Sequence, residues 1–238
     1  MWRKPPATKR ARSEPTLSQK RAAKLARKKY REAERLFLAE GEDLVSESSE
    51  PPRHLFIETE DVRKISTLTT PTGPVGVFPF LDVGATELLR SRDRIVALHG
   101  LQDPGNVGTI IRAAHAFGAG VALSRRSADL YNPKTVRATM GSIFHAPIAR
   151  EIETAGFLEE ASSDGFTTIA AVPEAGESPT SLPDGKLVLV VGAEGSGLPE
   201  EVISACDGAV TIPSQAASLN AAVAASILLY EAYMRVLP

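Results

Sequence analysis

Two stretches of the chain hold residues whose types and spacing could do chemistry. The first is the run Gly-Ala-Glu-Gly-Ser-Gly at residues 192–197, which holds Glu194 between glycines. Small residues with free backbone torsions can form a tight turn there, and the apolar run 187–191 before it predicts a buried strand. The residue types leave two interpretations open, a turn that binds a ligand and a tight connection between a strand and a helix.

The second stretch contains Asn106 and Arg112. The run 100–106 is rich in turn-forming residues and ends in Asn106, a good helix cap, and a helix is expected over 107–117. Arg112 then lies near the end of the second helical turn. A capping asparagine and a surface arginine would explain both residues without any chemistry, so neither identifies a site by itself.

Several common kinds of site are excluded. Glycines 192, 195 and 197 do not have the spacing Gly-x-Gly-x-x-Gly of a dinucleotide site, and the turn lacks the Gly-Lys-Ser/Thr of a triphosphate loop. The four histidines show no metal-ligand spacing, so no metal is expected. A single cysteine, Cys206, excludes a disulfide framework and a cysteine-based zinc site. The chain contains no Gly-x-Ser-x-Gly nucleophile motif.

The elements that must position these residues alternate between strand and helix from residue 94 onward. This order predicts an α/β fold with a mainly parallel sheet and helices on both faces. Strands are expected at 94–99, 121–123, 167–172, 187–191 and 209–212, with an extended stretch at 143–148. Helices are expected at 107–117, 132–140 and 157–162, and from 218–220 to about 236. The ends of strands 187–191 and 209–212, each followed by a small-residue loop, could lie side by side, where open α/β sheets bind small ligands.

The N-terminal part of the chain shows a different organisation. Residues 1–17 are rich in Pro, Lys and Arg without periodicity, and we expect a disordered arm. A helical pattern covers 18–38, and residues 39–90 predict a small α/β module with strands at 55–57 and 75–78, a helix at 60–68, and a linker at 79–93. The predicted division is an arm at 1–17, a first domain at 18–90 and a second domain at 91–238.

Charge is distributed unevenly along the chain. Residues 1–35 hold 13 Lys and Arg against 3 acidic residues, whereas the remainder holds 14 against 26. The expected helix 18–38 would carry a basic face, formed by Lys24, Lys28, Arg31 and Arg35. Such a face could neutralise phosphates without reading bases, which favours a nucleic-acid partner over a merely solvated helix.

The chain offers no feature of a membrane or secreted protein. No apolar run reaches the roughly 20 residues that a membrane span needs. The N-terminus is charged rather than apolar, unlike a secretory signal. Together with the lone cysteine, these features predict a protein of the reducing cytoplasm.

Three ordered motifs between residues 94 and 236 resemble those of a known family. They are Asp-Pro-Gly-Asn-Val-Gly at 103–108 followed by Arg112, Leu-Val-Val-Gly-Ala-Glu-Gly-Ser-Gly-Leu at 189–198, and Ile-Pro at 212–213 followed by Ser-Leu-Asn at 218–220. The chain thereby resembles the SpoU (TrmH-type) branch of the SPOUT RNA methyltransferases. The segment Tyr-Asn-Pro-Lys at 131–134, with Arg137 and Met-Gly at 140–141, is also similar to a family segment. Residues 37–41 and 65–77 more weakly resemble the family's RNA-binding domain, in a shortened form.

The resemblance implies a concrete fold and activity. The second domain would be a SPOUT domain with a deep trefoil knot, in a homodimer that binds RNA and needs no metal. The cofactor would be S-adenosyl-L-methionine, bound at Gly192, Gly197, Ile212 and Leu219. The family's functional positions match Asn106, Arg112, Glu194, Ser218 and Asn220. The reaction would be methylation of a ribose 2′-hydroxyl in rRNA or tRNA. The apolar face of the last helix (Leu219, Val223, Ile227, Tyr230) would lie near the dimer interface, or else form ordinary core.

The resemblance also assigns Arg112 the task of activating the 2′-hydroxyl. A guanidinium does not normally release a proton in proteins, so a base role for Arg112 is difficult. A substrate phosphate beside Arg112 could take the proton instead, or Arg112 could hold that phosphate and stabilise the developing alkoxide. We favour the electrostatic role.

The loop 214–217 departs from the family pattern, because it is shorter than usual and lacks the usual glycine. Three functions therefore remain open. The leading hypothesis is a 2′-O-ribose methyltransferase; the second is an RNA-binding protein on a SPOUT scaffold with weakened catalysis, which the short loop favours. The third, a dinucleotide-dependent enzyme, is disfavoured by the glycine spacing.

Overall fold

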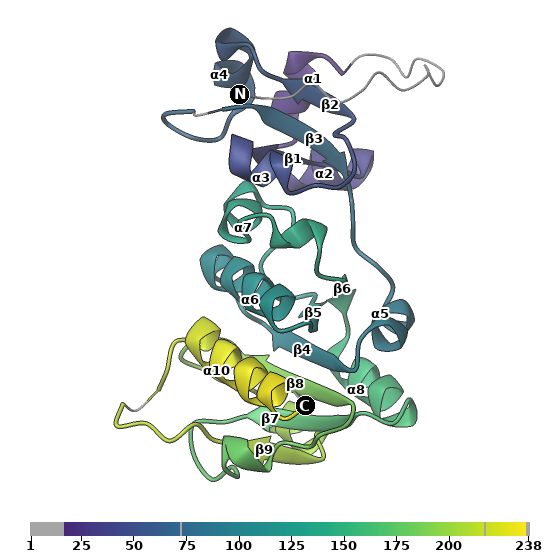
Figure 1. The fold of residues 1–238 in the computed structure, drawn as a ribbon, viewed down its shortest axis with the longest axis vertical. Helices are drawn as coiled ribbons and strands as arrows, with labels where there is room; N and C mark the ends of the chain where they lie inside the picture. The colour runs from purple at the N-terminus through teal and green to yellow at the C-terminus, as the bar shows by residue number, and fades with distance from the viewer. Residues whose placement is uncertain (1–16, 72, 217, 237–238) are drawn as a thin grey trace.

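A computed structural model describes residues 17–71, 73–216 and 218–236. These residues form two β-sheets stacked along the long axis of the molecule (Figure 1). The smaller sheet has the strand order β1-β3-β2, and the larger one has the order β6-β5-β4-β8-β7-β9. The basic arm predicted at 1–17 lies outside the described residues except for Leu17, which is buried.

The smaller sheet is antiparallel and lies at the top of Figure 1. Its strands are β1 (Leu36–Glu40), β2 (His54–Phe56) and β3 (Val75–Pro79). Its helices are α1 (Gln19–Lys24), α2 (Lys28–Glu34), α3 (Glu42–Ser46) and α4 (Thr59–Ile65). The strands and helix predicted within residues 39–90 are thus present with small shifts in their bounds.

The prediction of a single helix over 18–38 is wrong. The chain bends after α1, where Leu25 inserts into the core of the small sheet, and α2 ends at Arg35, which has a left-handed φ of 54°. The Arg31 side chain donates to the carbonyl oxygen of Leu25 at 2.7 Å and thereby satisfies the end of α1. Residues 36–38, expected to be helical, instead belong to β1 (Leu36–Glu40), in which every residue is buried.

The larger sheet is entirely parallel, as predicted. Its strands are β4 (Arg94–His99), β5 (Gly120–Ser124), β6 (Ile148–Ile152), β7 (Thr167–Ala171), β8 (Leu187–Gly192) and β9 (Gly208–Val210). The uninterrupted apolar character of β4 and β8 reflects their central position, since both faces of these strands are covered.

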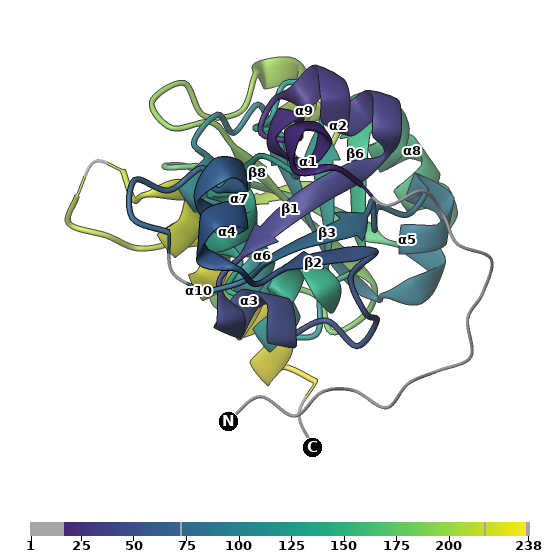
Figure 2. The ribbon, with the colours of Figure 1, turned by 90° about the horizontal axis from the view of Figure 1, so that it is seen from above.

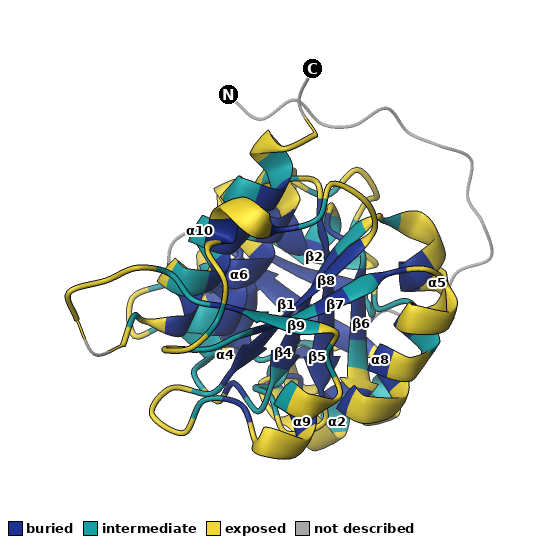
Figure 3. Cartoon of the chain, turned by 90° about the horizontal axis from the view of Figure 1, so that it is seen from below, coloured by how far each residue is buried: buried dark blue, intermediate teal, exposed yellow. Residues whose placement is uncertain are grey.

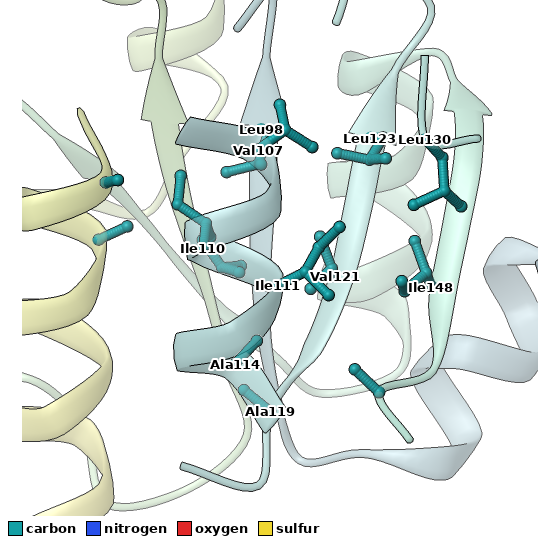
Figure 4. Close-up of a cluster of buried hydrophobic side chains, with 14 of the residues drawn as sticks. Leu98, Val107, Ile110, Ile111, Ala114, Ala119, Val121, Leu123, Leu130 and Ile148 are labelled. Carbon is teal, nitrogen blue, oxygen red and sulfur yellow. The ribbon is translucent and has the colours of Figure 1, made fainter. Parts of the chain in front are cut away.

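Helices cover both faces of this sheet. One face carries α6 (Pro104–Ala116), α7 (Pro133–Ala138) and α10 (Ala221–Met234), and the other carries α5 (Ala85–Ser91), α8 (Thr154–Ser163) and α9 (Glu200–Ser204). Figure 4 shows Val107, Ile110 and Ile111 of α6 packed onto residues of β4 and β5. Short 3₁₀ turns lie at Ser142–Phe144 and Pro179–Ser181.

Three other expectations differ from the structure. The linker predicted at 79–93 contains α5, whose Leu88 and Leu89 are buried against β5 and β6. The stretch 143–148 is not extended, because Met140 (φ 47°) and Gly141 (φ 92°) reverse the chain into a 3₁₀ turn and the strand begins only at Ile148. Strand β9 ends at Val210, earlier than the predicted 212.

A network of charged side chains joins the two sheets. Arg150 of β6 pairs with Glu32 of α2 at 2.7 Å and with Asp82 at 3.2 Å. Tyr131 donates to Asp82 at 2.8 Å, and Arg31 pairs with Asp129 at 2.6 Å. Seen from above, the small sheet overlies the larger one (Figure 2), and these contacts span the junction between them. In the part of the chain that the structure describes, no helix is long and apolar enough to cross a membrane.

Candidate functional site

A cavity of about 630 Å³ lies at the carboxyl edge of β7, β8 and β9. Three loops line it, namely 171–175 after β7, 192–197 after β8, and 211–220 between β9 and α10. Four predicted cofactor residues border it: Gly192, Gly197, Ile212 and Leu219. Three of the five residues carried over as catalytic, Glu194, Ser218 and Asn220, also line the cavity.

The turn 193–197 closes on itself through a hydrogen bond from the amide of Gly197 to the carbonyl oxygen of Ala193, at 2.9 Å. Gly195 and Gly197 have left-handed φ values of 82° and 66°, which side chains disfavour. Gly192 is needed for another reason, because a Cβ there would lie 2.6 Å from the amide nitrogen of Leu198. The atoms that a Cβ at Gly192 would meet belong to the backbone of the same turn.

Asn106 does not cap its helix. Helix α6 begins at Pro104, and Asp103 is the cap, accepting from the amide of Asn106 at 2.9 Å. This hydrogen bond is the main cause that holds the pKa of Asp103 below its ordinary value. The prediction that Asn106 is the cap was therefore wrong, and the earlier start of the helix leaves the amide side chain of Asn106 free for other partners.

Those partners are the two loops of the cavity. The Asn106 side chain donates to the carboxylate of Glu194 in the 192–197 turn, and it accepts from the side chain of Asn220 at 3.2 Å. Asn220 in turn caps α10, accepting from the amides of Ala222 and Val223. Asn106 thus connects the starts of α6 and α10 to the glycine turn, although the three residues lie far apart in the sequence.

Arg112 lies apart from this network. It is the ninth residue of α6 and is exposed, and it makes no hydrogen bond or ion pair within the described part of the chain. The rise of an α-helix places it about 9 Å along the axis from Asn106, and it does not line the cavity. The structure therefore brings four of the five predicted catalytic residues together and leaves Arg112 beside them on α6.

The cavity is negatively charged. Among the described residues that line it, the ionisable side chains are those of Glu174 and Glu194, and none is Lys, Arg or His. Among the residues that the structure describes, no group of three or more His, Cys, Asp or Glu side chains is placed to hold a metal ion. Loop 171–175, which contains Glu174, was not indicated by the sequence beyond its Pro and Gly content. The signal in the sequence is that this loop directly follows β7, the strand next to β8.

The four predicted RNA-binding residues do not form one face. Arg31 is 3% exposed and paired with Asp129, so this residue cannot contact RNA, and its assignment was wrong. Arg35 lies over the ring of Phe80, and Lys28 is 3.6 Å from Glu151. Lys24, Lys28 and Arg35 remain exposed, on α1, on α2 and directly after α2.

Comparison with known proteins gives consistent relatives. A family model described as the SpoU rRNA Methylase family matches residues 93–230. The 23S rRNA (guanosine(2553)-2′-O)-methyltransferase RlmP of Bacillus subtilis is 31% identical over 230 residues, which cover 87% of this chain and 92% of that protein.

Solved structures are similar over nearly the whole chain. An AdoMet-bound rRNA methyltransferase from Sinorhizobium meliloti aligns with a TM-score of 0.84 and 30% identity, over 92% of this chain and 95% of that one. The SpoU methyltransferase AviRb from Streptomyces viridochromogenes, in complex with the cofactor AdoMet, aligns with a TM-score of 0.78 and 26% identity, over 91% and 96% of the two chains.

Proposed function

The chain belongs to the SpoU rRNA methylase family, and from this premise we propose that it transfers a methyl group from S-adenosylmethionine to a ribose 2′-hydroxyl of RNA. The observation that carries the proposal is the link between Asn106, Glu194 and Asn220, which joins the glycine turn and the starts of two helices at one edge of the cavity.

The cavity fits S-adenosylmethionine better than a dinucleotide. This cofactor carries a sulfonium and an ammonium group, and the overall negative field of Glu174 and Glu194, with no cationic side chain among the described lining residues, suits such a cation without requiring either carboxylate to pair with it directly. A dinucleotide would bring a pyrophosphate to the same carboxylates without a cation to pair with it. Small residues such as Gly192, Gly197 and Ala193 leave backbone groups open to a ligand.

S-adenosylmethionine supplies a methyl group already activated on a positively charged sulfur, so close positioning is the main task left to the chain. Glu194, held by Asn106, would keep the turn closed over the cofactor. Ser218 and Asn220 would shape the opposite loop beside the target ribose. The backbone at Gly192, Gly197, Ile212 and Leu219 would hold the cofactor.

Arg112 would act on the RNA rather than on the cofactor. It is exposed on α6, outside the cavity, and it has no partner among the described residues that would neutralise its charge. We assign it to a substrate phosphate next to the target ribose, where it stabilises the charge that develops on the 2′-oxygen. Because a guanidinium does not normally release a proton in proteins, we favour this role over direct removal of the proton.

Ribosomal RNA is the favoured substrate, with transfer RNA as the alternative. One relative, which aligns over 87% of this chain, is a 23S rRNA methyltransferase. The test is to map 2′-O-methylated nucleotides in total cytoplasmic RNA from a strain lacking the gene and from its parent. Loss of one methylated ribose in rRNA supports the proposal. Loss of a methylated ribose in tRNA alone would show that tRNA is the substrate. Identical maps would contradict it.

The knot and the domain division are part of the same proposal. The chain leaves β9 at the edge of the sheet and returns as α10 to pack against β8, β4 and α6, a path compatible with a trefoil knot. We propose the same three parts that the sequence predicted, an arm, a first domain and a second domain, but with the arm ending at residue 16, because Leu17 belongs to the core of the small sheet. Because α5 packs on the larger sheet, a boundary before Ala85 fits better than one at residue 90.

A homodimer through α10 is also proposed. Its inner face is buried, while Val223, Tyr230 and Met234 on the other face are 48%, 47% and 44% exposed. Figure 3 shows this helix with both buried and exposed stretches. Light scattering after size exclusion should give the mass of a dimer for the native chain and a smaller mass for Tyr230→Asp. A monomeric native chain would contradict this assembly.

A further inference from the structure

The far wall of the cavity is formed by the loop 172–177, which follows β7. Glu174 lies in this loop, is exposed, and lines the cavity together with Pro173 and Ala175. Unlike Glu194, which is held by Asn106, Glu174 makes no hydrogen bond or ion pair within the described residues. Both of its carboxylate oxygens are therefore available to a ligand.

The loop that carries Glu174 is fixed in place. The Thr211 hydroxyl accepts from the amide of Gly176 at 2.9 Å and donates to the carbonyl oxygen of Val172 at 3.1 Å. The backbones of Glu177 and Thr211 are hydrogen-bonded at 2.9 Å. These three hydrogen bonds hold the backbone of the loop in place, which lowers the entropic cost of ordering it when a ligand binds.

The backbone of the loop is also strained. Ala175 has a left-handed φ of 63°, and a Cβ at Gly176 would lie 2.6 Å from the carbonyl carbon of Val210. Left-handed non-glycine residues persist where their surroundings determine the conformation, and they cluster at ligand clamps. The turn thus fixes the backbone at Glu174 beside the cavity.

The strand order shows which part of a ligand Glu174 can meet. Asn106 follows β4, and Glu194 follows β8, next to it; Glu174 follows β7, on the side of β8 away from β4. At the usual spacing of strands, Glu174 is roughly 10 Å from the start of α6. The transferred methyl must face the Asn106 side, so Glu174 faces a group remote from the methyl.

We propose that Glu174 accepts hydrogen bonds from the two ribose hydroxyls of the cofactor's adenosine. This inference rests on the proposed function. A vicinal diol presents two donors that match the two acceptor oxygens of a carboxylate, the same chemistry by which acidic residues hold ribose in dinucleotide folds. Glu174 is thereby a residue that determines specificity for the cofactor and takes no part in methyl transfer.

The test is calorimetry with two ligands, S-adenosylhomocysteine and 5′-methylthioadenosine, which lacks the amino-acid part. Glu174→Ala should lower the affinity for both ligands by a similar factor, roughly tenfold or more, as expected when hydrogen bonds to a charged group are lost. Glu174→Gln, which keeps one acceptor oxygen, should lower both affinities by a smaller factor. Glu177→Gln is the matched control, since this neighbouring carboxylate does not line the cavity.

Other outcomes are equally decisive. Unchanged affinity in Glu174→Ala would overturn the inference while leaving the proposed function intact. If Glu174→Ala weakened the binding of S-adenosylhomocysteine but left that of 5′-methylthioadenosine unchanged, the inference would be overturned too. This result would assign Glu174 to the ammonium group. If the native chain bound neither ligand, the proposed function itself would fail. Thermal unfolding of each variant verifies that the exposed substitution leaves the fold intact.

Discussion

Asn106 shows how one side chain can acquire a role through the place where its helix begins. Asp103 takes over the cap and Pro104 occupies the first helical position, which suits a residue without an amide hydrogen. The Asn106 amide then joins Glu194 to Asn220. The sequence predicted that these residues matter, but the link could not be read from it, because their partners lie 88 and 114 positions away.

Arg112 is the residue with the most direct predicted effect on the reaction. Arg112→Ala should leave the affinity for S-adenosylhomocysteine nearly unchanged, because Arg112 does not line the cavity. Single-turnover transfer of labelled methyl should fall by about 10²–10³-fold, as when one donor to a developing oxyanion is removed. Arg112→Lys should rescue the rate only in part, because a point charge does not replace a planar fork. A near-normal rate in Arg112→Ala would remove Arg112 from the mechanism.

Among the elements, the strand β8 and its glycine turn were the most predictable. A run of five apolar residues predicts a central strand, and glycines predict a tight turn. The basic helix was the least predictable element. Charge periodicity predicts a solvent-exposed face, but Arg31 pairs with Asp129, 98 residues away, and β1 begins where a helix was expected. Such tertiary contacts override local pattern.

The turn after β8 should tolerate no side chain at its first glycine. Gly192→Ala would force a Cβ against the Leu198 amide, and overpacking of this kind costs about 1–3 kcal/mol. We expect a lower melting temperature and S-adenosylhomocysteine affinity reduced by tenfold or more. Gly185→Ala, before the same strand, is the control, because no atom lies within 4 Å of the added Cβ. Equal behaviour of the two variants in calorimetry would show that the turn adapts.

At the scale of the whole molecule, the two sheets are joined by a partly buried network around Arg150. Burial opposes ionisation of Asp82, but the hydrogen bond from Tyr131 and the charge of Arg150 outweigh it and lower the pKa of Asp82. A carboxyl group whose pKa is lowered by folding stabilises the fold above its ordinary pKa of 3.8, and this contribution is lost as the pH falls below that value. The junction is therefore fully formed at neutral pH.

Removing the central cation should uncouple the sheets. Arg150→Met leaves Glu32 without this partner, while Asp82 keeps Tyr131 and Arg35. We expect a loss of roughly 2–4 kcal/mol in unfolding free energy, below the value for fully buried pairs because Glu32 is partly exposed and Asp82 keeps these contacts. Glu32→Gln, which keeps a hydrogen-bonding side chain, should cost less. Urea unfolding measures both, and equal stability of all three proteins would show that the network does not hold the junction.

The basic arm should supply general affinity for RNA. The deletion must stop at residue 16, because Leu17, Ala22 and Leu25 belong to the core of the small sheet. The deleted stretch holds five cations, Arg3, Lys4, Lys9, Arg10 and Arg12. Removing them should reduce the slope of log K against log salt by up to about 3.5 for single-stranded RNA. Replacing the five by Gln, at constant length, should have the same effect, and an unchanged slope would exclude phosphate contacts by the arm.

The central claim, that this cavity and the residues at its edge methylate ribose, is tested most directly by the product itself. The purified chain is incubated with methyl-labelled S-adenosylmethionine and deproteinised RNA from a strain lacking the gene. The RNA is then digested to nucleosides and analysed by mass spectrometry. We predict one labelled 2′-O-methylnucleoside, which disappears with Asn106→Ala although this variant keeps its Asp103 cap and its melting temperature. Label on a base, or no label in any RNA, would contradict the claim.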